Sequence, residues 1–366
     1  MFCSALPSSR SIVLLIVLAV SVLVILKLLL VDEQYLLGIA PLYESEASDQ
    51  RVLHRNQTLG VASKIYVLSL PMRDDRRQDM EHLRKTLDLH WSYIEAIDAE
   101  NPIVETIMNS VRLIRETYPA TSSFTWPDDL PPPDKPMDPW SPGFLSPTRS
   151  VDGQATAHKP MPCATQNNSI VPYTPDLPEH KILTASRVAC WYSHISVIST
   201  IANDDTLRGD DAVIVLEDDV DMERDISHRL RRVWSSLPAG WDIVYLGHCW
   251  SDESINLALD ADGTFSVTNG TFPVTHIHPS RSPLCTHAYA LSRTGARRLL
   301  VHLRYPPFAY SRAIDKAISW LIESGRLKSF SIVPSIVVQR KAGKSDIMSG
   351  KGSTWRASLV NGIFGN

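Results

Sequence analysis

The chain has 366 residues, of which 44% are hydrophobic and 21% charged, so it can bury one large core or two smaller ones. Its formal net charge is −4 and no basic stripe occurs, which argues against a nucleic-acid-binding protein. The cysteines show neither CxxC nor Cys/His zinc spacing, which excludes a structural zinc module.

The first element is an apolar run, residues 12–31, that is long enough to cross a bilayer as a helix. It is too long for a signal-peptide core and lacks a small-residue cleavage site, so we interpret it as an uncleaved anchor, with a cleaved signal peptide as the alternative. Arg10 precedes the run and two acidic residues follow it, which places residues 1–11 in the cytosol. The sequence predicts a single-pass type II protein of the Golgi or endoplasmic reticulum membrane with a lumenal body.

The residues after the anchor agree with a lumenal location. Residues 32–63 are predicted to form a polar stem, and N-glycosylation sequences begin at Asn56, Asn167 and Asn269. The four lumenal cysteines allow up to two disulfides, and no pairing is assigned. Cys190 lies in a helical apolar pattern and is compatible with a buried thiol.

The first strand is expected at residues 64–70, followed by a helix that extends through Leu87. Arg73, Arg76 and Arg77 lie in the strand-to-helix turn. Guanidinium groups and helix N-termini both attract anions, so these arginines are candidates for binding a diphosphate. A solvated first turn capped by an aspartate is the alternative.

Prolines are frequent and apolar periodicity is weak between residues 126 and 178, which predicts a long surface insertion. Apolar residues then recur at helical spacing from Ser186 to Ala202. Ser193 and His194 lie within this helix and are candidate binding residues. Packing is the alternative explanation for a single histidine in a helix.

An acidic triplet, Glu217, Asp218 and Asp219, follows the apolar strand predicted at Ala212–Leu216. Ligands bind at the carboxyl ends of strands in open α/β sheets. Clustered carboxylates repel one another and are commonly neutralised by a hard divalent cation, here Mn²⁺ or Mg²⁺, which could hold a diphosphate. A solvated turn is the alternative.

A second strand, Trp241–Leu246, follows a helical pattern between Ile226 and Leu237 and predicts a βαβ unit with the carboxylates at its edge. Thr286 and His287 begin a further strand that continues through residues 288–291. His287 is compatible with packing.

In this order, the segments resemble glycosyltransferase family 25, which includes lipooligosaccharide and collagen galactosyltransferases. The resemblance rests on Lys64–Arg77, Cys190–His194, Val215–Val220, Trp241–Gly247 and Thr286–Ser292. It extends from Lys64 to Ile347 and is interrupted by the proline-rich insertion. The anchor and the insertion suggest a fungal-type member.

The resemblance implies a GT-A-like α/β fold, a Rossmann-type mixed sheet flanked by helices, forming one catalytic domain over residues 64–347 with a C-terminal tail at 348–366. It also implies transfer of a hexose, with galactose favoured, from a UDP-sugar to a glycan or glycoprotein hydroxyl, with inversion and a divalent metal. In this scheme Glu217 and Asp219 face the metal and the ribose. Asp218 points to the opposite face, as alternation along extended backbone requires.

The resemblance also implies binding roles for four further residues. Ser193 and His194 are candidates for the donor site, and Thr286 and His287 are candidates for lining the sugar pocket.

The resemblance further identifies Asp315, at the start of a helix predicted over Ile314–Ile322, as the candidate general base. A helix-end carboxylate stabilised by the dipole is the alternative role. The family often has a Gly-Glu pair where this chain has Ser186 and Arg187, which puts the donor-side loop chemistry in doubt.

Two other function classes remain. A catalytically silent, membrane-anchored lectin or scaffold is the non-enzyme alternative. A metal-dependent hydrolase is less favoured, because the sequence offers neither a second metal-ligand group at useful spacing nor a basic track for a phosphodiester polymer.

Overall fold

The computed structural model describes residues 57–117, 126, 159–259, 265–266, 274–340 and 359–365. All of them belong to the second of two compact units, residues 55–366. No helix within these ranges is long and apolar enough to cross a membrane. The predicted anchor, residues 12–31, lies outside the described residues.

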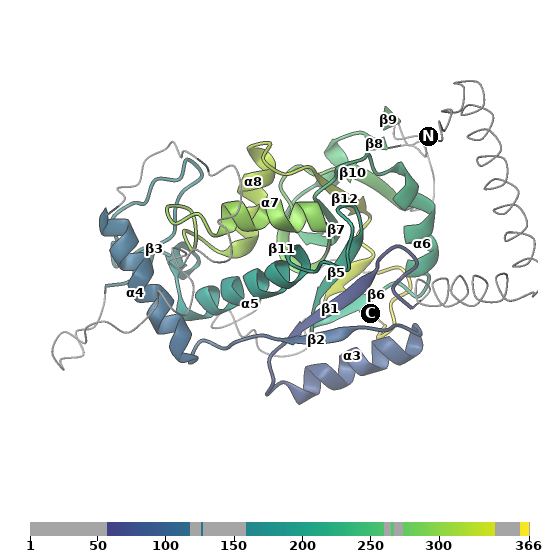
Figure 1. The fold of residues 1–366 in the computed structure, drawn as a ribbon, viewed down its shortest axis with the longest axis horizontal. Helices are drawn as coiled ribbons and strands as arrows, with labels where there is room; N and C mark the ends of the chain where they lie inside the picture. The colour runs from purple at the N-terminus through teal and green to yellow at the C-terminus, as the bar shows by residue number, and fades with distance from the viewer. Residues whose placement is uncertain are drawn as a thin grey trace, which may run out of the picture. The chain divides into compact units, whose positions relative to one another are not determined.

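The described body is built on a nine-stranded mixed sheet in the order β2-β1-β5-β11-β7-β12-β10-β8-β9 (Figure 1). In chain order its strands are β1 (Lys64–Ser69), β2 (Ser92–Glu95), β5 (Ala212–Glu217), β7 (Ile243–Cys249), β8 (Ala258–Leu259), β9 (Phe265–Ser266), β10 (His276–Pro279), β11 (Leu284–Ser292) and β12 (Ser329–Val333). β2, β1 and β5 are parallel, and β12 is parallel to β7. The expectation of an α/β fold with a mixed sheet flanked by helices is confirmed.

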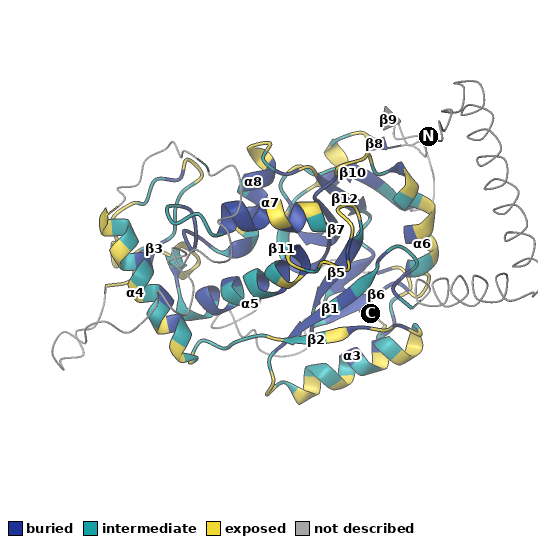
Figure 2. Cartoon of the chain, in the orientation of Figure 1, coloured by how far each residue is buried: buried dark blue, intermediate teal, exposed yellow. Residues whose placement is uncertain are grey.

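Helices cover both faces of the sheet (Figure 1). The helical elements are α3 (Asp74–Thr86), α4 (Pro102–Thr117), η1 (Glu179–Lys181), α5 (Ala185–Ala202), α6 (Ile226–Val233), η2 (Trp234–Ser236), η3 (Glu253–Ile255), α7 (Arg293–Leu303) and α8 (Ile314–Glu323). Val213 and Val215 of β5 face a core shared with α4, α5, α7 and α8, whereas Ile214 and Leu216 face a core shared with α3 and α6. Both faces of β5 are therefore buried, which explains its unbroken apolar sequence (Figure 2).

The predicted βαβ unit is wrong in one respect, because β5 and β7 are not neighbours. β11 lies between them and is antiparallel to both, with Ala288 opposite Leu216 on one side and Gly247 on the other. Strands that are consecutive along a chain are neighbours only about two-thirds of the time. β11 has nine residues, and the last seven of them are buried. A position between two neighbouring strands at the centre of the sheet provides this burial.

A two-stranded antiparallel sheet places residues 337–339 beside the acidic triplet. β6 (Val220–Met222) pairs with β13 (Val337–Gln339), and Gln339 lies opposite Val220. The described part of the predicted C-terminal tail also packs here, because Glu223 accepts hydrogen bonds from the backbone N–H groups of Val360 and Asn361, at 2.8 and 2.9 Å.

The body begins before the predicted boundary at residue 64. Leu59 and Ala62, which were assigned to the stem, are 0% and 1% exposed and belong to the hydrophobic core. The Ser63 N–H donates to the carbonyl of Ala212 at 2.8 Å. Residues 57–63 are therefore part of the folded body.

The predicted surface insertion also has a packed component. β3 (Met161–Pro162) pairs with β4 (Ile182–Leu183), and Met161 is only 6% exposed. Trp126 packs against the rings of Phe308 and Trp320. The prediction of a wholly superficial segment was wrong for these residues, because isolated apolar side chains without periodicity still reach the core.

The remaining expectations concern cysteines and glycosylation sequences. Cys249 and Cys285 form a disulfide, whereas Cys163 and Cys190 are free and partly buried. Asn167 is exposed on a described turn, whereas Asn56 and Asn269, the acceptor residues of the other two glycosylation sequences, lie outside the described residues.

Candidate functional site

The acidic triplet lines one side of a cavity of about 420 Å³ at the carboxyl end of β5. Glu217 ends the strand, and Asp218 and Asp219 form the turn that leads into β6. Asp218 was expected to point to the opposite face of the sheet, but all three residues line the same cavity. The expectation was wrong because strand alternation ends where the chain turns.

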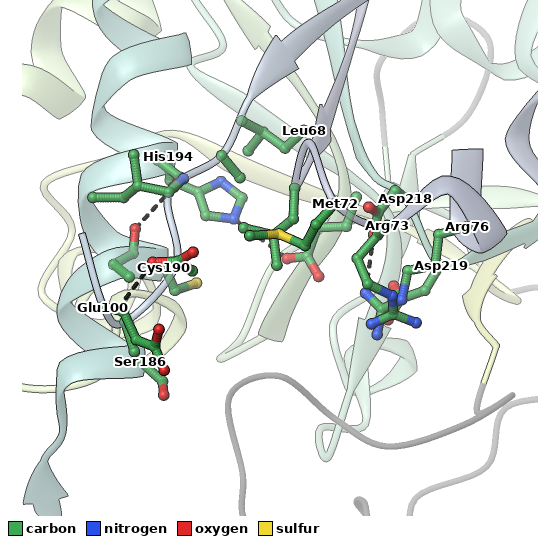
Figure 3. A pocket seen from close by; sticks show the side chains of 18 of the residues that line it. Leu68, Met72, Arg73, Arg76, Glu100, Ser186, Cys190, His194, Asp218 and Asp219 are labelled. Carbon is green, nitrogen blue, oxygen red and sulfur yellow. Dashed lines mark hydrogen bonds and ion pairs between the residues drawn. The ribbon is translucent and has the colours of Figure 1, made fainter.

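Two faces of the cavity come from different elements, as Figure 3 shows. One face carries Ser186, Cys190 and His194 of α5, and the other carries Arg73, Arg76, Asp218 and Asp219 (Figure 3). Helix α5 begins after Thr184, whose side chain accepts a hydrogen bond from the Arg187 N–H. The cap therefore fixes the helix start from which these side chains reach the cavity.

The arginines of the strand-to-helix turn divide into two groups. Arg76 Nη1 is 2.9 Å from Asp218 Oδ1 and 3.3 Å from Asp219 Oδ2. Arg73 also lines the cavity and forms an ion pair with Asp75 at 2.8 Å. Arg77 does not line it, because its Nε donates to Ser69 Oγ at 3.0 Å. Two of the three predicted arginines are therefore at the site.

Glu217 is held by a network that begins on the central strand β11. Thr286 Oγ1 donates to Glu217 Oε1 at 2.8 Å, and His194 Nε2 lies 3.3 Å from the same oxygen. The other ring nitrogen of His194 is 3.0 Å from the Tyr289 hydroxyl. Burial alone would raise the pKa of Glu217, but its interactions with His194 and Thr286 outweigh burial and lower that pKa. Glu217 is therefore an ionised carboxylate in a fixed orientation.

Asp219 provides the test of whether a cation fits this site. Its Oδ2 accepts a hydrogen bond from Gln339 Nε2 at 3.1 Å, but its Oδ1 is buried and has no partner among the described residues. Burial raises the pKa of Asp219 to about 7, and the charge of Glu217 adds to the rise. A buried acceptor oxygen beside other carboxylates is costly without a countercharge, so the residues present fit a divalent cation.

Ser193 and His287, the remaining predicted binding residues, have different positions. Ser193 lines the cavity, and its Oγ accepts a hydrogen bond from the Ile97 N–H at 3.0 Å, which ties the loop after β2 to α5. His287 is 2% exposed and does not line the cavity. Its Nε2 is 3.3 Å from the carbonyl oxygen of Val337, as the packing alternative expects.

Asp315 lies in the first turn of α8, outside the cavity lining. Its Oδ2 accepts a hydrogen bond from the Cys285 N–H at 3.3 Å, and its Oδ1 accepts one from the Lys316 N–H at 2.7 Å. Burial raises the pKa of the Cys190 thiol well above its ordinary value, and the charges of Glu217 and Asp315 add to the rise. Cys190 lines the cavity, whereas Asp315 does not.

Comparison with known protein families identifies the family of this chain. The sequence model described as "Glycosyltransferase family 25 (LPS biosynthesis protein)" matches residues 62–316. This chain belongs to glycosyltransferase family 25.

Two curated members of the family are similar to parts of the chain. One is the "Probable inactive glycosyltransferase 25 family member 3" of Bos taurus, 30% identical over 154 residues, which are 41% of this chain and 23% of that protein. The other is the "Inactive glycosyltransferase 25 family member 3" of Homo sapiens, 30% identical over 123 residues, which are 33% of this chain and 18% of that protein. The matched stretches thus cover less than a quarter of either relative.

Two features of this site in the family 25 chain were not predicted from its sequence. Gln339 reaches Asp219 only because β13 pairs with β6, and residues 96–100 line the cavity only because β2 pairs with β1. A short strand before residue 96 was the available signal, since its carboxyl end meets that of β1 at the same edge.

The departure from the family pattern at Ser186 and Arg187 has a simple structural outcome. Ser186 lines the cavity, so a small hydroxyl occupies this part of the wall. Arg187 is 7% exposed and is absent from the cavity lining, because its Nη1 donates to the backbone carbonyl of Glu179 at 2.8 Å. In this family 25 chain, Arg187 therefore holds the segment before α5.

Proposed function

We propose that this protein transfers a hexose, with galactose favoured, from a UDP-sugar to a hydroxyl group of a glycan or glycoprotein, with inversion and with a divalent cation. The observation that carries the proposal is the unpartnered, buried Oδ1 of Asp219 in a cavity that also contains Arg73 and Arg76. Carboxylates suit a cation, and guanidinium groups suit a diphosphate.

Glu217 and Asp219 are the residues that would hold Mn²⁺ or Mg²⁺. When bound, such an ion offsets negative charge that develops on a leaving diphosphate. Arg76 adds a positive charge at the same edge, where it now pairs with Asp218. His194 and Thr286 keep Glu217 oriented without being ligands themselves.

Inversion requires a base that takes the proton of the acceptor hydroxyl. We assign this role to Asp315, whose carboxylate acts on Cys190 at the cavity wall and belongs to an element distant in sequence from the triplet. An ionised aspartate can accept the proton as the new glycosidic bond forms. The backbone hydrogen bonds from Cys285 and Lys316 hold the carboxylate in place.

A catalytically silent protein is the second candidate, and it is favoured by the names of the two relatives, which describe them as inactive. Retention of Glu217, Asp219 and Asp315 in this chain supports the active alternative. The two candidates differ in turnover, because a silent protein could still bind a nucleotide.

A donor screen tests the proposed activity. We expect the protein to release UDP from UDP-galactose in the presence of Mn²⁺, more slowly from UDP-glucose and the UDP-N-acetylhexosamines, and not at all with EDTA. Binding of UDP without release from any donor would favour the silent protein. Failure to bind any UDP-sugar would contradict the proposal as a whole.

We further propose that the protein is held in the Golgi or endoplasmic reticulum membrane by residues 12–31, with its body in the lumen. The prediction is that it stays in the membrane pellet after carbonate extraction and shifts in mobility after glycosidase treatment. Asn167 is exposed and suited to carry a glycan, so Asn167→Gln should remove part of that shift. A soluble, unglycosylated protein would overturn this proposal.

A further inference from the structure

A second cavity, of about 530 Å³, lies beside α8 and is separate from the one that contains the acidic triplet. Its lining comes from α8, from the segment around residues 163–181 and from Leu284 at the start of β11. No residue lines both cavities. The proposed chemistry at the triplet therefore leaves this cavity without a role.

The charges that line this second cavity are unbalanced. Lys181, Arg312 and Lys316 line it together with a single carboxylate, that of Glu323. Within the described part of the chain, none of these three cations forms an ion pair with a carboxylate. The cavity is therefore positively charged.

Arg312 is the most informative of these cations because it is 4% exposed. Its guanidinium group donates to Asn168 Oδ1 and, at 3.2 Å, to Ser311 Oγ, which are both neutral acceptors. Burial lowers the pKa of Arg312 to about 10. The guanidinium group also lies over the rings of Phe308 and Trp320, 5.3 and 5.9 Å from their centroids. None of these partners carries a negative charge, so a bound anion would supply the missing countercharge.

His180 also lines this cavity and responds to the same charges. Burial lowers the pKa of its imidazole, and the charges of Lys316, Lys181 and Arg187 lower it further. These side chains come from η1, α5 and α8, so the fold gathers positive charge from distant parts of the sequence. Such convergence is typical of sites that recognise carboxylate or phosphate groups.

Asp315, the proposed base, lies close in the chain to residues that line the second cavity. Lys316, the next residue, lines the second cavity, and so does Leu284, which precedes the residue whose N–H binds Asp315 Oδ2. The charge of Asp315 also acts on Cys190, which lines the first cavity. Asp315 itself lines neither cavity, but the next residue, Lys316, lines the second one.

We propose that the second cavity binds a negatively charged group, a carboxylate or a phosphate, carried by the acceptor. The identification of its ligand as the acceptor rests on the proposed glycosyl transfer, whereas the preference for an anion rests on the cavity alone. The charged group would be held by Lys181, Arg312 and Lys316, the last of which follows Asp315 directly in the chain.

Calorimetric titration of the full chain, at low ionic strength and with saturating UDP and Mn²⁺ to fill the first cavity, tests this proposal. The probes are inorganic phosphate, methyl glucuronide as the carboxylate and methyl glucoside as the neutral control. We expect at least one anion to bind and the glucoside not to bind. The preferred anion identifies the charged group as a phosphate or a carboxylate.

The matched variants decide whether any binding occurs in the second cavity. The double variant Lys181→Ala, Lys316→Ala replaces two exposed side chains and should weaken anion binding about tenfold or more. Arg312→Gln should act in the same direction, and its melting temperature reports whether it folds. Lys85→Ala, an exposed lysine of α3, should leave anion binding unchanged.

Anion affinity that is equal in the double variant and in Lys85→Ala, or equal affinity for glucoside and glucuronide, would overturn the proposal. If UDP does not bind, it cannot fill the first cavity during the titration. The titration is then repeated with Arg76→Ala, because loss of this guanidinium group weakens any anion binding in the first cavity. Anion binding that depends on Lys181 and Lys316 would then support the anion site while the proposed transfer fails. The two failures are therefore distinguishable.

Discussion

Replacement of Asp219 by alanine is expected to abolish metal-dependent binding of UDP while the fold remains intact. The side chain supplies an unpartnered buried oxygen beside Glu217, so its loss removes a cation ligand. Burial and the charge of Glu217 raise the pKa of Asp219 to about 7, and the nearby Arg76 offsets this rise only in part, so the ionised carboxylate is destabilising without a further cation. Removing it should therefore not lower the melting temperature.

Titration with UDP in the presence of Mn²⁺, together with a thermal melt, measures both parts of this prediction. The matched control is Asp210→Ala, which removes an exposed carboxylate just before β5, at the end remote from the triplet. That variant should bind UDP like the wild type. If the affinity for UDP were unchanged in both Asp219→Ala and Glu217→Ala, that result would falsify the metal-site assignment.

Asp315→Asn is expected to keep donor binding and to lower the transfer rate by about 10² to 10⁴, the usual contribution of a general base. An amide cannot take the acceptor proton, although its oxygen can still accept a backbone hydrogen bond. The affinity for UDP should be unchanged, because Asp315 does not line the donor cavity. Transfer rates at saturating donor measure the effect.

The melting temperature of Asp315→Asn separates catalysis from a purely structural role. Asp315 accepts hydrogen bonds from the N–H groups of Lys316 and Cys285, as a helix-end carboxylate would. If that were its whole contribution, asparagine should cost about 1 kcal/mol or less of stability and little activity. Near-normal turnover would therefore remove Asp315 from the mechanism and leave the base unassigned.

The sequence predicted the elements whose apolar pattern is long and regular. The strand at Ala212–Glu217 and the helix at Ala185–Ala202 follow from burial on both faces and from helical spacing. The place of β11 between β5 and β7 could not be predicted, since strand order depends on pairing between residues far apart in the chain. For the same reason, the packing of Met161 and Leu59 in the core was missed.

In the candidate site, too, residues that belong to local sequence patterns were predicted, whereas contacts between distant parts of the chain were not. The structure brings together Arg73, Arg76, Ser193, His194 and the acidic triplet in one cavity, and Thr286 contacts Glu217 from outside the cavity lining. Arg77 instead donates to Ser69, and His287 lies against the carbonyl oxygen of Val337. The spacing of residues in the sequence predicts neither partner. Gln339 joins Asp219 through a strand pair formed more than a hundred residues apart in the sequence.

The most direct test of the central claim is the position of Mn²⁺ in crystals of the protein grown with UDP. Anomalous diffraction at the manganese edge locates the ion without any assumption about activity. The proposed function predicts a single strong peak in contact with Asp219 Oδ1 and Glu217, with the diphosphate beside Arg76. Nucleotide bound in another cavity, or a peak away from the triplet while UDP is present, would contradict the account.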